Sequence, residues 1–345
     1  MKICRFDIET TNACKGIALI LLLWHHLFYA ETGYGFITIA TAKLSKVCVA
    51  IFIILSGYGL SESMKSKRIG LIDFYKKRLI KIYLNYWLIS ALFVPIGIFF
   101  FGRTLDSVFN NHEYLKFALQ LTGLHRWIYD EYGYNITWWY MSVIIPLYIL
   151  FPFIFNLTNK FGLWFLFFCL ILLLPIGINV GELNNWILPF ALGIYFSRIN
   201  GFVKLRSLFY KAGILRLFIM IFLIFIVALF RVYGIILTGT KIDWMFGGLI
   251  ILLTFEITNY SIIIRKGLSF LGTHLFNIFL FHTFIYLYFW KDFIYSFKYP
   301  VLIFLVLLST CIIVSLIIEN LKKLLLFYKL ESMICGIKIH EVNTI

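Results

Sequence analysis

Long apolar stretches separated by short polar segments recur along the whole chain. Apolar stretches of about 20 residues are typical of helices that cross the ~30 Å hydrocarbon core of a bilayer. The pattern predicts an all-α polytopic membrane protein, a bundle that forms a single membrane-embedded domain over residues 1–345. We expect about ten spans, at 16–30, 46–61, 80–101, 137–158, 161–179, 184–199, 214–236, 242–260, 268–290 and 301–321.

Composition supports the membrane prediction, and the distribution of charge orients the chain. The 345 residues are 62% hydrophobic and 14% charged, whereas a soluble domain has about a quarter of its residues charged. With both termini in the cytoplasm, 22 of the 31 Lys and Arg residues fall in inner segments and nine outside. This asymmetry follows the positive-inside rule, so we predict a multi-pass protein of the bacterial cell membrane with two cytoplasmic termini.

The sequence does not predict nucleic-acid binding, a metal site or a signal peptide. The net charge of +15 is spread over the inner loops, where it suits membrane lipid, and no separate basic tail points to nucleic acid. The six cysteines include no CxxC pair and show no metal-ligand spacing, so we predict no metal site. The first apolar stretch lacks a small-residue cleavage site, and we expect a retained helix instead of a signal peptide.

Lys15 and His26 lie eleven residues apart in the first apolar stretch. Eleven residues make about three helical turns, so both side chains fall on one face, roughly 16 Å apart. Ionisable groups inside a bilayer are costly and are usually functional. A neutral imidazole can take a proton from a hydroxyl, and we expect His26 to be a general base, the alternative being a hydrogen bond between helices. His25 points elsewhere, and we expect it to be structural.

Arg78 and Lys81 lie three residues apart at the predicted inner end of the third span, so they flank each other on one helix face. Arg offers a two-pronged donor and Lys a point charge, and both suit phosphate groups. The alternative is an ordinary topology signal of the positive-inside kind, which is the interpretation that we favour for the neighbouring lysines.

Polar and aromatic residues in three other spans are candidates for contacts to a substrate or a transition state. Ser56 and Tyr58 flank Gly57 in the second span, where a glycine permits close approach of another backbone. Trp139 begins the fourth span, and His282 lies in the ninth. Each of these signals is weak when it is taken alone.

Two polar features stand apart from these candidates. The predicted outer loop, residues 102–136, mixes carboxylates with Trp and Tyr, which suits a carbohydrate; an interfacial aromatic belt with solvated charge is the alternative. Glu256 lies in the eighth span near its inner end, where hydropathy predicts a buried side chain; the alternative is that the side chain extends to water.

With these residues in view, the chain resembles the acyltransferase-3 family of bacterial membrane O-acyltransferases over about residues 10–320. The family signature in the first helix, a basic residue, ten intervening residues and a His, matches Lys15 and His26, although Arg is more frequent at the first position. The stretch FIILSGYGL is similar to the SG motif of the second helix. Arg78 and Lys81 match the family's RxxR pattern with Lys at the second position, and the Pro expected near Leu84 is absent.

Two more segments carry the resemblance. Trp139, Tyr148 and Pro152 match the W…Y…P layout of the fourth helix, but WWYMSVII lacks the Glu that many relatives have there. The missing Glu argues against a mechanism in which a carboxylate of this segment assists the base. LGTHLFNIFLFHTF resembles the family's segment in the ninth span, with His282 at the position of the His.

The resemblance implies a ten-helix enzyme that transfers an acyl group, usually acetyl, from cytosolic acyl-CoA to a sugar hydroxyl of a surface polysaccharide. Acyl-CoA (acetyl-CoA) would be the co-substrate and a polysaccharide or lipid-linked glycan the acceptor. The phosphates of CoA would bind Arg78, Lys81 and Lys15, and His26 would meet the thioester. Ser56, Tyr58 and Trp139 are candidates for the donors that stabilise the oxyanion. The alternatives are a transporter or flippase for a lipid-linked sugar and a glycan polymerase, because ionisable residues in spans also mark substrate paths.

Overall fold

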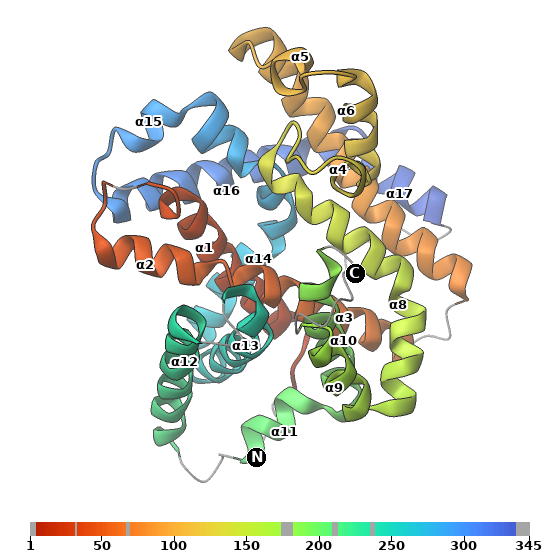
Figure 1. Ribbon diagram of the computed structural model, residues 1–345, viewed down its shortest axis with the longest axis vertical. Coiled ribbons are helices and arrows are strands. Elements are labelled where there is room, and N and C mark those ends of the chain that lie inside the picture. Colours follow the sequence, from red (N-terminus) through yellow and green to blue (C-terminus); the bar gives the residue numbers. More distant parts are fainter. Residues whose placement is uncertain are drawn as a thin grey trace. The chain divides into compact units, whose positions relative to one another are not determined.

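The computed structural model describes residues 5–31, 33–66, 70–173, 182–208, 213–234 and 239–335. Within these ranges every regular element is a helix (Figure 1). Seven described segments are long and apolar enough to cross a membrane, and the bent pair α10 (Leu183–Ile199) and α11 (Gly201–Leu208) raises the number to eight. The chain is therefore an all-α, multi-pass membrane protein, while the count of ten spans and the sides of the termini stay predictions.

A helix lies in each predicted span, but several boundaries differ from those expected. The corresponding helices are α1 (Ile8–Phe28), α3 (Cys48–Ser66), α4 (Leu71–Phe101), α8 (Met141–Phe161), α9 (Leu163–Ile171), α10, α12 (Leu215–Tyr233), α13 (Asp243–Tyr260), α14 (Ile262–Thr283) and α16 (Pro300–Leu324). Residues 174–179 of the fifth predicted span and 235–236 of the seventh lie outside the described residues. α1 and α4 begin eight and nine residues before the predicted spans, because the polar turns that precede each apolar run are also helical.

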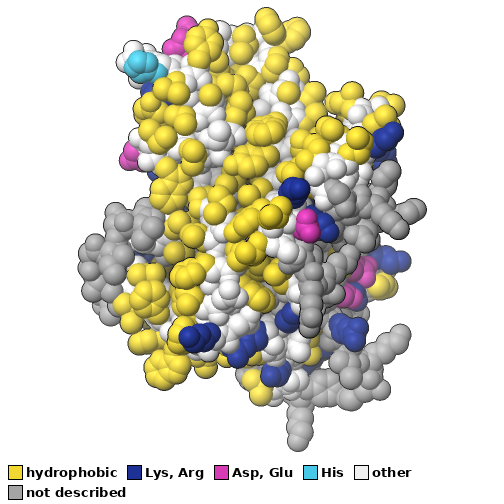
Figure 2. All heavy atoms as spheres, turned by 90° about the vertical axis from the view of Figure 1, so that its right-hand side faces the viewer, with side chains coloured by type: hydrophobic (Ala, Val, Ile, Leu, Met, Phe, Trp, Pro, Cys, Tyr) yellow, Lys and Arg dark blue, Asp and Glu magenta, His cyan; other side chains and the backbone are white. Residues whose placement is uncertain are grey.

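The first compact part of the chain comprises Met1–Arg68 and Leu150–Leu275. In it, α1 packs against α2 (Phe36–Ser45), α3 and α13, and α3 packs along α10. α12 packs beside α13, and most of its apolar side chains are exposed, as expected for a helix that faces lipid. On the face drawn in Figure 2, hydrophobic side chains cover most of the upper and middle part, and most of the visible Lys and Arg side chains lie lower down.

Glycines bring the backbones of two helix pairs of this first part together. A Cβ added to Gly57 of α3 would overlap the Phe190 carbonyl oxygen of α10, and one added to Gly193 of α10 would overlap the carbonyl oxygen of Ile54. Gly272 of α14 lies equally close to the backbone of α1. Membrane helices often associate through such small residues, because burial of apolar surface gives little drive in lipid.

Charged groups of this part are buried as pairs. Glu256 is completely buried, as hydropathy predicts, and accepts hydrogen bonds from Arg206 and Arg216, so the alternative that its side chain reaches water was wrong. Hydropathy could not show that two arginines from α11 and α12 converge on this carboxylate. Arg231 of α12 likewise pairs with buried Asp243 of α13 at 2.6 Å.

The second compact part comprises Ile69–Ile149 and Phe276–Ile345. Its long helix α4 has 31 residues, about 46 Å, which exceeds the thickness of a hydrocarbon core. The predicted outer loop is not irregular: it forms α5 (Leu105–Val108), α6 (Glu113–Thr122) and α7 (His125–Ile128), which follow the end of α4 (Figure 1). The 3₁₀-helix η1 (Ile136–Tyr140) then leads into α8.

The same part continues from the end of α14 through the π-helical stretch η4 (Phe284–Phe289), α15 (Lys291–Tyr295) and α16 to α17 (Phe327–Cys335). α17 packs against α4 and α16. Like α2 in the first part, α17 was not expected from the sequence, because it is short and mixes polar with apolar residues. The prediction of one domain over the whole chain stays a prediction.

Candidate functional site

Lys15 and His26 lie on one uninterrupted helix, α1. Asp7 caps its N-terminus by accepting a hydrogen bond from the Thr10 backbone N–H at 2.8 Å. Because α1 is continuous from Ile8 to Phe28, the eleven-residue spacing places both side chains on the same face, as expected. Both side chains are partly exposed, and His26 lies in the last turn of the helix.

His25 differs from His26 in its surroundings. The His25 ring is buried, and its Nδ1 lies 2.8 Å from the carbonyl oxygen of Ala42 in α2. A carbonyl oxygen only accepts, so Nδ1 carries the proton in this contact. His25 thus helps to hold α2 against α1, whereas the partly exposed His26 has the accessibility that a general base needs.

Two residues of the Ser56–Tyr58 motif, Gly57 and Tyr58, take part in helix packing. Gly57 allows α3 to approach α10, as described above. The ring of Tyr58 is buried beside the stacked rings of Phe6 and Phe202, with centroids 5.1 and 5.4 Å away. Tyr58 therefore packs in an aromatic cluster, while Ser56 is partly exposed.

Arg78 and Lys81, here called the donor cluster, lie in the second and third turns of α4 and are partly exposed. They do not begin the helix, as the predicted boundary implied, because α4 starts at Leu71. Arg78 interacts electrostatically with Tyr148 of α8, which joins two motifs that are distant in sequence. Lys81 interacts with Glu331 of α17. Burial raises the pKa of the Glu331 carboxyl, although Lys81 acts in the opposite direction.

A buried polar network beside the donor cluster was not predicted. Lys322 of α16 donates to Glu319 at 2.7 Å and to Asn277 of α14 at 2.9 Å, and Tyr328 of α17 donates to the same Glu319. Lys81 also interacts with this pair of charges on α16. The only available signal in the sequence was the occurrence of Glu and Lys three residues apart at the end of an apolar run.

His282 is fully buried at the point where α14 passes into the π-helical stretch. Its Nδ1 lies 2.9 Å from the carbonyl oxygen of Ile278 and 3.1 Å from that of Phe279, so Nδ1 carries the proton and Nε2 the lone pair. The ring stacks on Tyr286. π-Helical turns are frequent at functional sites, which keeps His282 among the candidates.

Asn135 anchors the segment that carries Trp139. Its buried side-chain oxygen accepts from the Thr137 backbone N–H at 2.9 Å and from the hydroxyl of Thr283 at 2.9 Å. The Trp138 indole N–H donates to the Leu280 carbonyl at 2.9 Å. The turn before α8 is therefore fixed against the helix of His282, which the sequence did not reveal.

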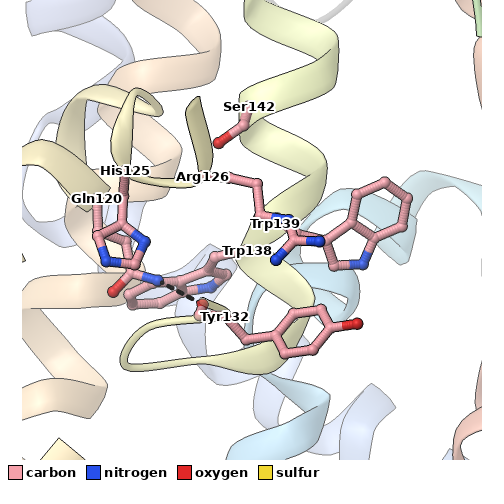
Figure 3. Close-up of a pocket in the computed structure, with 7 residues that line it drawn as sticks. All are labelled: Gln120, His125, Arg126, Tyr132, Trp138, Trp139 and Ser142. Carbon is pink, nitrogen blue, oxygen red and sulfur yellow. Dashed lines mark hydrogen bonds between the residues drawn. The ribbon is translucent and has the colours of Figure 1, made fainter. Parts of the chain in front are cut away.

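A small hollow lies beside this anchored turn (Figure 3). Its buried wall is formed by Gln120, His125, Trp138 and Ser142, and its accessible edge by Arg126, Tyr132 and Trp139. It has room for about one water-sized group, far less than the ~300–1,000 Å³ of typical ligand pockets. It would hold one small polar group.

Paired charges shape the electrostatics around the hollow. Burial lowers the pKa of His125 below its ordinary value, although Glu131, 3.3 Å from Nε2, opposes this shift. Burial would raise the pKa of the Glu131 carboxyl, but Lys116 at 2.9 Å and His125 hold it below its usual range. Within the described residues no group of three His, Cys, Asp or Glu side chains suits a metal ion.

The candidate residues fall into two sets. Lys15, His26, Ser56 and Tyr58 belong to the first compact part, and Arg78, Lys81, Trp139 and His282 to the second. Within the second part the structure joins the motifs of α4 and α8 at Arg78 and Tyr148. It also joins the turn that carries Trp139 with the helix of His282, through Asn135.

These features define a multi-pass α-helical membrane protein with a basic residue and a histidine in phase on its first helix. A family model described as an acyltransferase domain matches residues 9–319, nearly the whole chain. The chain belongs to the acyltransferase-3 family. It is a membrane acyltransferase by that membership, as the motifs in the sequence predicted.

The search of curated proteins and the search of solved structures each found no match to this chain.

Proposed function

We propose that this protein transfers an acyl group, most simply acetyl, from acyl-CoA to a sugar hydroxyl of a surface polysaccharide or its lipid-linked precursor, at the bacterial plasma membrane. The family membership over residues 9–319 carries the proposal. The placement of His26 supports it, because a partly exposed imidazole lies on the same helix face as Lys15.

His26 is the general base of the proposed reaction. It takes the proton of the acceptor hydroxyl while that oxygen attacks the thioester carbonyl, and a C–O bond forms. The C–S bond of the tetrahedral intermediate then breaks, and the sulfur of CoA leaves with the proton that His26 returns. General acid–base catalysis of this kind contributes about 10²–10⁴-fold to the rate.

The donor cluster binds the phosphates of CoA in this proposal, with Lys15 as a further cation. Arg78 and Lys81 are partly exposed and lie three residues apart on α4, so both can face one anion. Ser56, Trp139 and His282 remain candidates for contacts to the acceptor or the oxyanion. Tyr58 is less accessible, because its ring is buried against two phenylalanines.

Acyl transfer by purified protein tests the proposal. The protein in lipid nanodiscs is incubated with acetyl-CoA labelled in the acetyl group and with chemically de-O-acylated surface polysaccharide of the host. We expect label on the glycan, and a loss of at least about 100-fold with His26→Ala. A transporter, flippase or polymerase would neither bind acetyl-CoA nor label the glycan. Near-normal transfer by His26→Ala would reject the role of His26.

His25→Ala is the matched control. His25 precedes His26 on the same helix but donates to the Ala42 carbonyl, so its loss leaves a buried acceptor without that donor. The loss of such a hydrogen bond lowers the free energy of unfolding by about 1–3 kcal/mol. We expect lower thermal stability with turnover per folded molecule close to that of the unaltered protein. Equal loss of turnover in both variants would show that the two rings do not have separate roles.

A further inference from the structure

We infer that the edge of the hollow beside η1 binds a neutral sugar unit of the acceptor glycan, and that one hydroxyl of this sugar enters the hollow. The inference rests on the proposed function for the identity of the ligand as an acceptor, but the binding site itself stands on separate observations. These are the rigidity of the hollow, the exposed rings at its edge and the balance of charge around it.

The segment 102–136 is held firmly where it forms the hollow. Three aromatic side chains of α4 donate to the last carbonyls of α6: Tyr83 to Thr122 at 2.8 Å, Tyr86 to Gln120 at 2.9 Å and Trp87 to Leu121 at 2.9 Å. The Trp127 indole N–H donates to the Ser142 carbonyl at 2.8 Å and ties α7 to α8. These bonds satisfy carbonyls that a helix end leaves open, and they fix the wall of the hollow before any ligand binds.

The buried wall is similarly ordered. The Gln120 side chain accepts from the Tyr134 backbone N–H at 2.8 Å and donates to the Tyr132 carbonyl at 3.2 Å, a contact drawn in Figure 3. This pair of bonds sets the path of residues 132–134 and with it the position of the Tyr132 ring. The wall can therefore receive a hydroxyl of the sugar without rearranging.

The edge of the hollow offers rings and hydrogen-bonding groups together. Tyr132 is 51% exposed and Trp139 is partly exposed, and the Arg126 guanidinium lies 4.9 Å from the centre of the Tyr132 ring. In Figure 3 these three side chains lie on one side of the hollow and His125 on the other. A sugar presents apolar C–H faces and hydroxyls, which match aromatic rings and the polar groups beside them.

The charges around the hollow favour an uncharged ligand over phosphate. Arg126 pairs with Asp130 at 2.9 Å, and Lys116 pairs with Glu131 at 2.9 Å. Each cation is thus matched by a carboxylate, in contrast to the excess of positive charge that an anion site needs. Asp130 is almost fully exposed and can accept from a sugar hydroxyl.

Glycan binding without acyl-CoA tests this inference. Calorimetry would measure binding of fragments of the de-O-acylated host polysaccharide to the full-length protein in nanodiscs. We expect Trp139→Ala and Tyr132→Ala each to weaken binding about tenfold, because each removes one ring contact. Trp139→Phe should retain most of the affinity. Tyr114→Ala, at a 75% exposed site on α6 outside the hollow, should leave binding unchanged.

Unchanged affinity in both alanine variants would overturn the sugar site, and displacement of the glycan by inorganic phosphate would overturn its assignment to a neutral sugar. The outcome is separable from that of the proposed function. Label transfer by the unaltered protein together with unchanged binding in the variants rejects only the site. Weakened binding in the variants without any label transfer keeps the site and rejects the acyltransferase proposal.

Discussion

Replacing Gly57 by Ala tests how closely α3 and α10 approach each other. The added Cβ would lie inside 3.0 Å of the Phe190 carbonyl oxygen and 3.1 Å from its carbonyl carbon, whereas ordinary contacts begin at 3.4 Å. Both obstructing atoms are backbone atoms, which cannot rotate away as a side chain can. Overpacking costs about 1–3 kcal/mol, and the rigid obstacle favours the upper end of this range. The higher helix propensity of Ala offsets about 1 kcal/mol, which leaves a net loss of about 2 kcal/mol.

Gly59→Ala is the matched control, because Gly59 lies two residues further along α3 and has no atom within 4 Å of an added Cβ. The assay is the thermal midpoint of each variant in the same detergent and at the same scan rate, since membrane proteins often unfold irreversibly. We expect Gly57→Ala and Gly193→Ala to melt several degrees lower, and Gly59→Ala to melt at or above the unaltered protein. If Gly57→Ala and Gly59→Ala had equal midpoints, the close contact of the two helices would be refuted.

Three further predictions concern charged groups. Arg231→Gln leaves buried Asp243 without its paired charge and should cost about 3–5 kcal/mol, seen as a lower yield of folded protein; normal yield and melting would contradict the pair. Since the pKa values of His125 and Glu131 are lowered on folding, the unfolded state binds more protons, and stability should fall as pH drops below about 6.5 and again below about 4.5. Melting curves of the unaltered protein and His125→Gln would show this, and an unchanged acid loss in the variant would argue against His125. Glu331→Gln removes the carboxylate that interacts with the second cation of the donor cluster, so affinity for acetyl-CoA should rise; weaker binding would contradict the phosphate role of that cluster.

The sequence alone determined the class and the family of this protein. Repeated apolar runs predict membrane helices whatever their neighbours are, because each helix satisfies its own backbone hydrogen bonds in lipid. The phase of Lys15 and His26 depends only on helical geometry, and α1 confirms that they share a face. Short motifs in the right order were enough to indicate the family that the match to residues 9–319 shows.

Only the tertiary structure decided which polar groups are paired and which elements meet. Hydropathy predicts that Glu256 is buried, but it does not show that two arginines from other helices reach this carboxylate. The sequence predicts a loop over residues 102–136, because the short helices there lack a long apolar run. Hydrogen bonds from the aromatic side chains of α4 hold these helices in place. Contacts of this kind join residues that are far apart along the chain, and local periodicity carries no information about them.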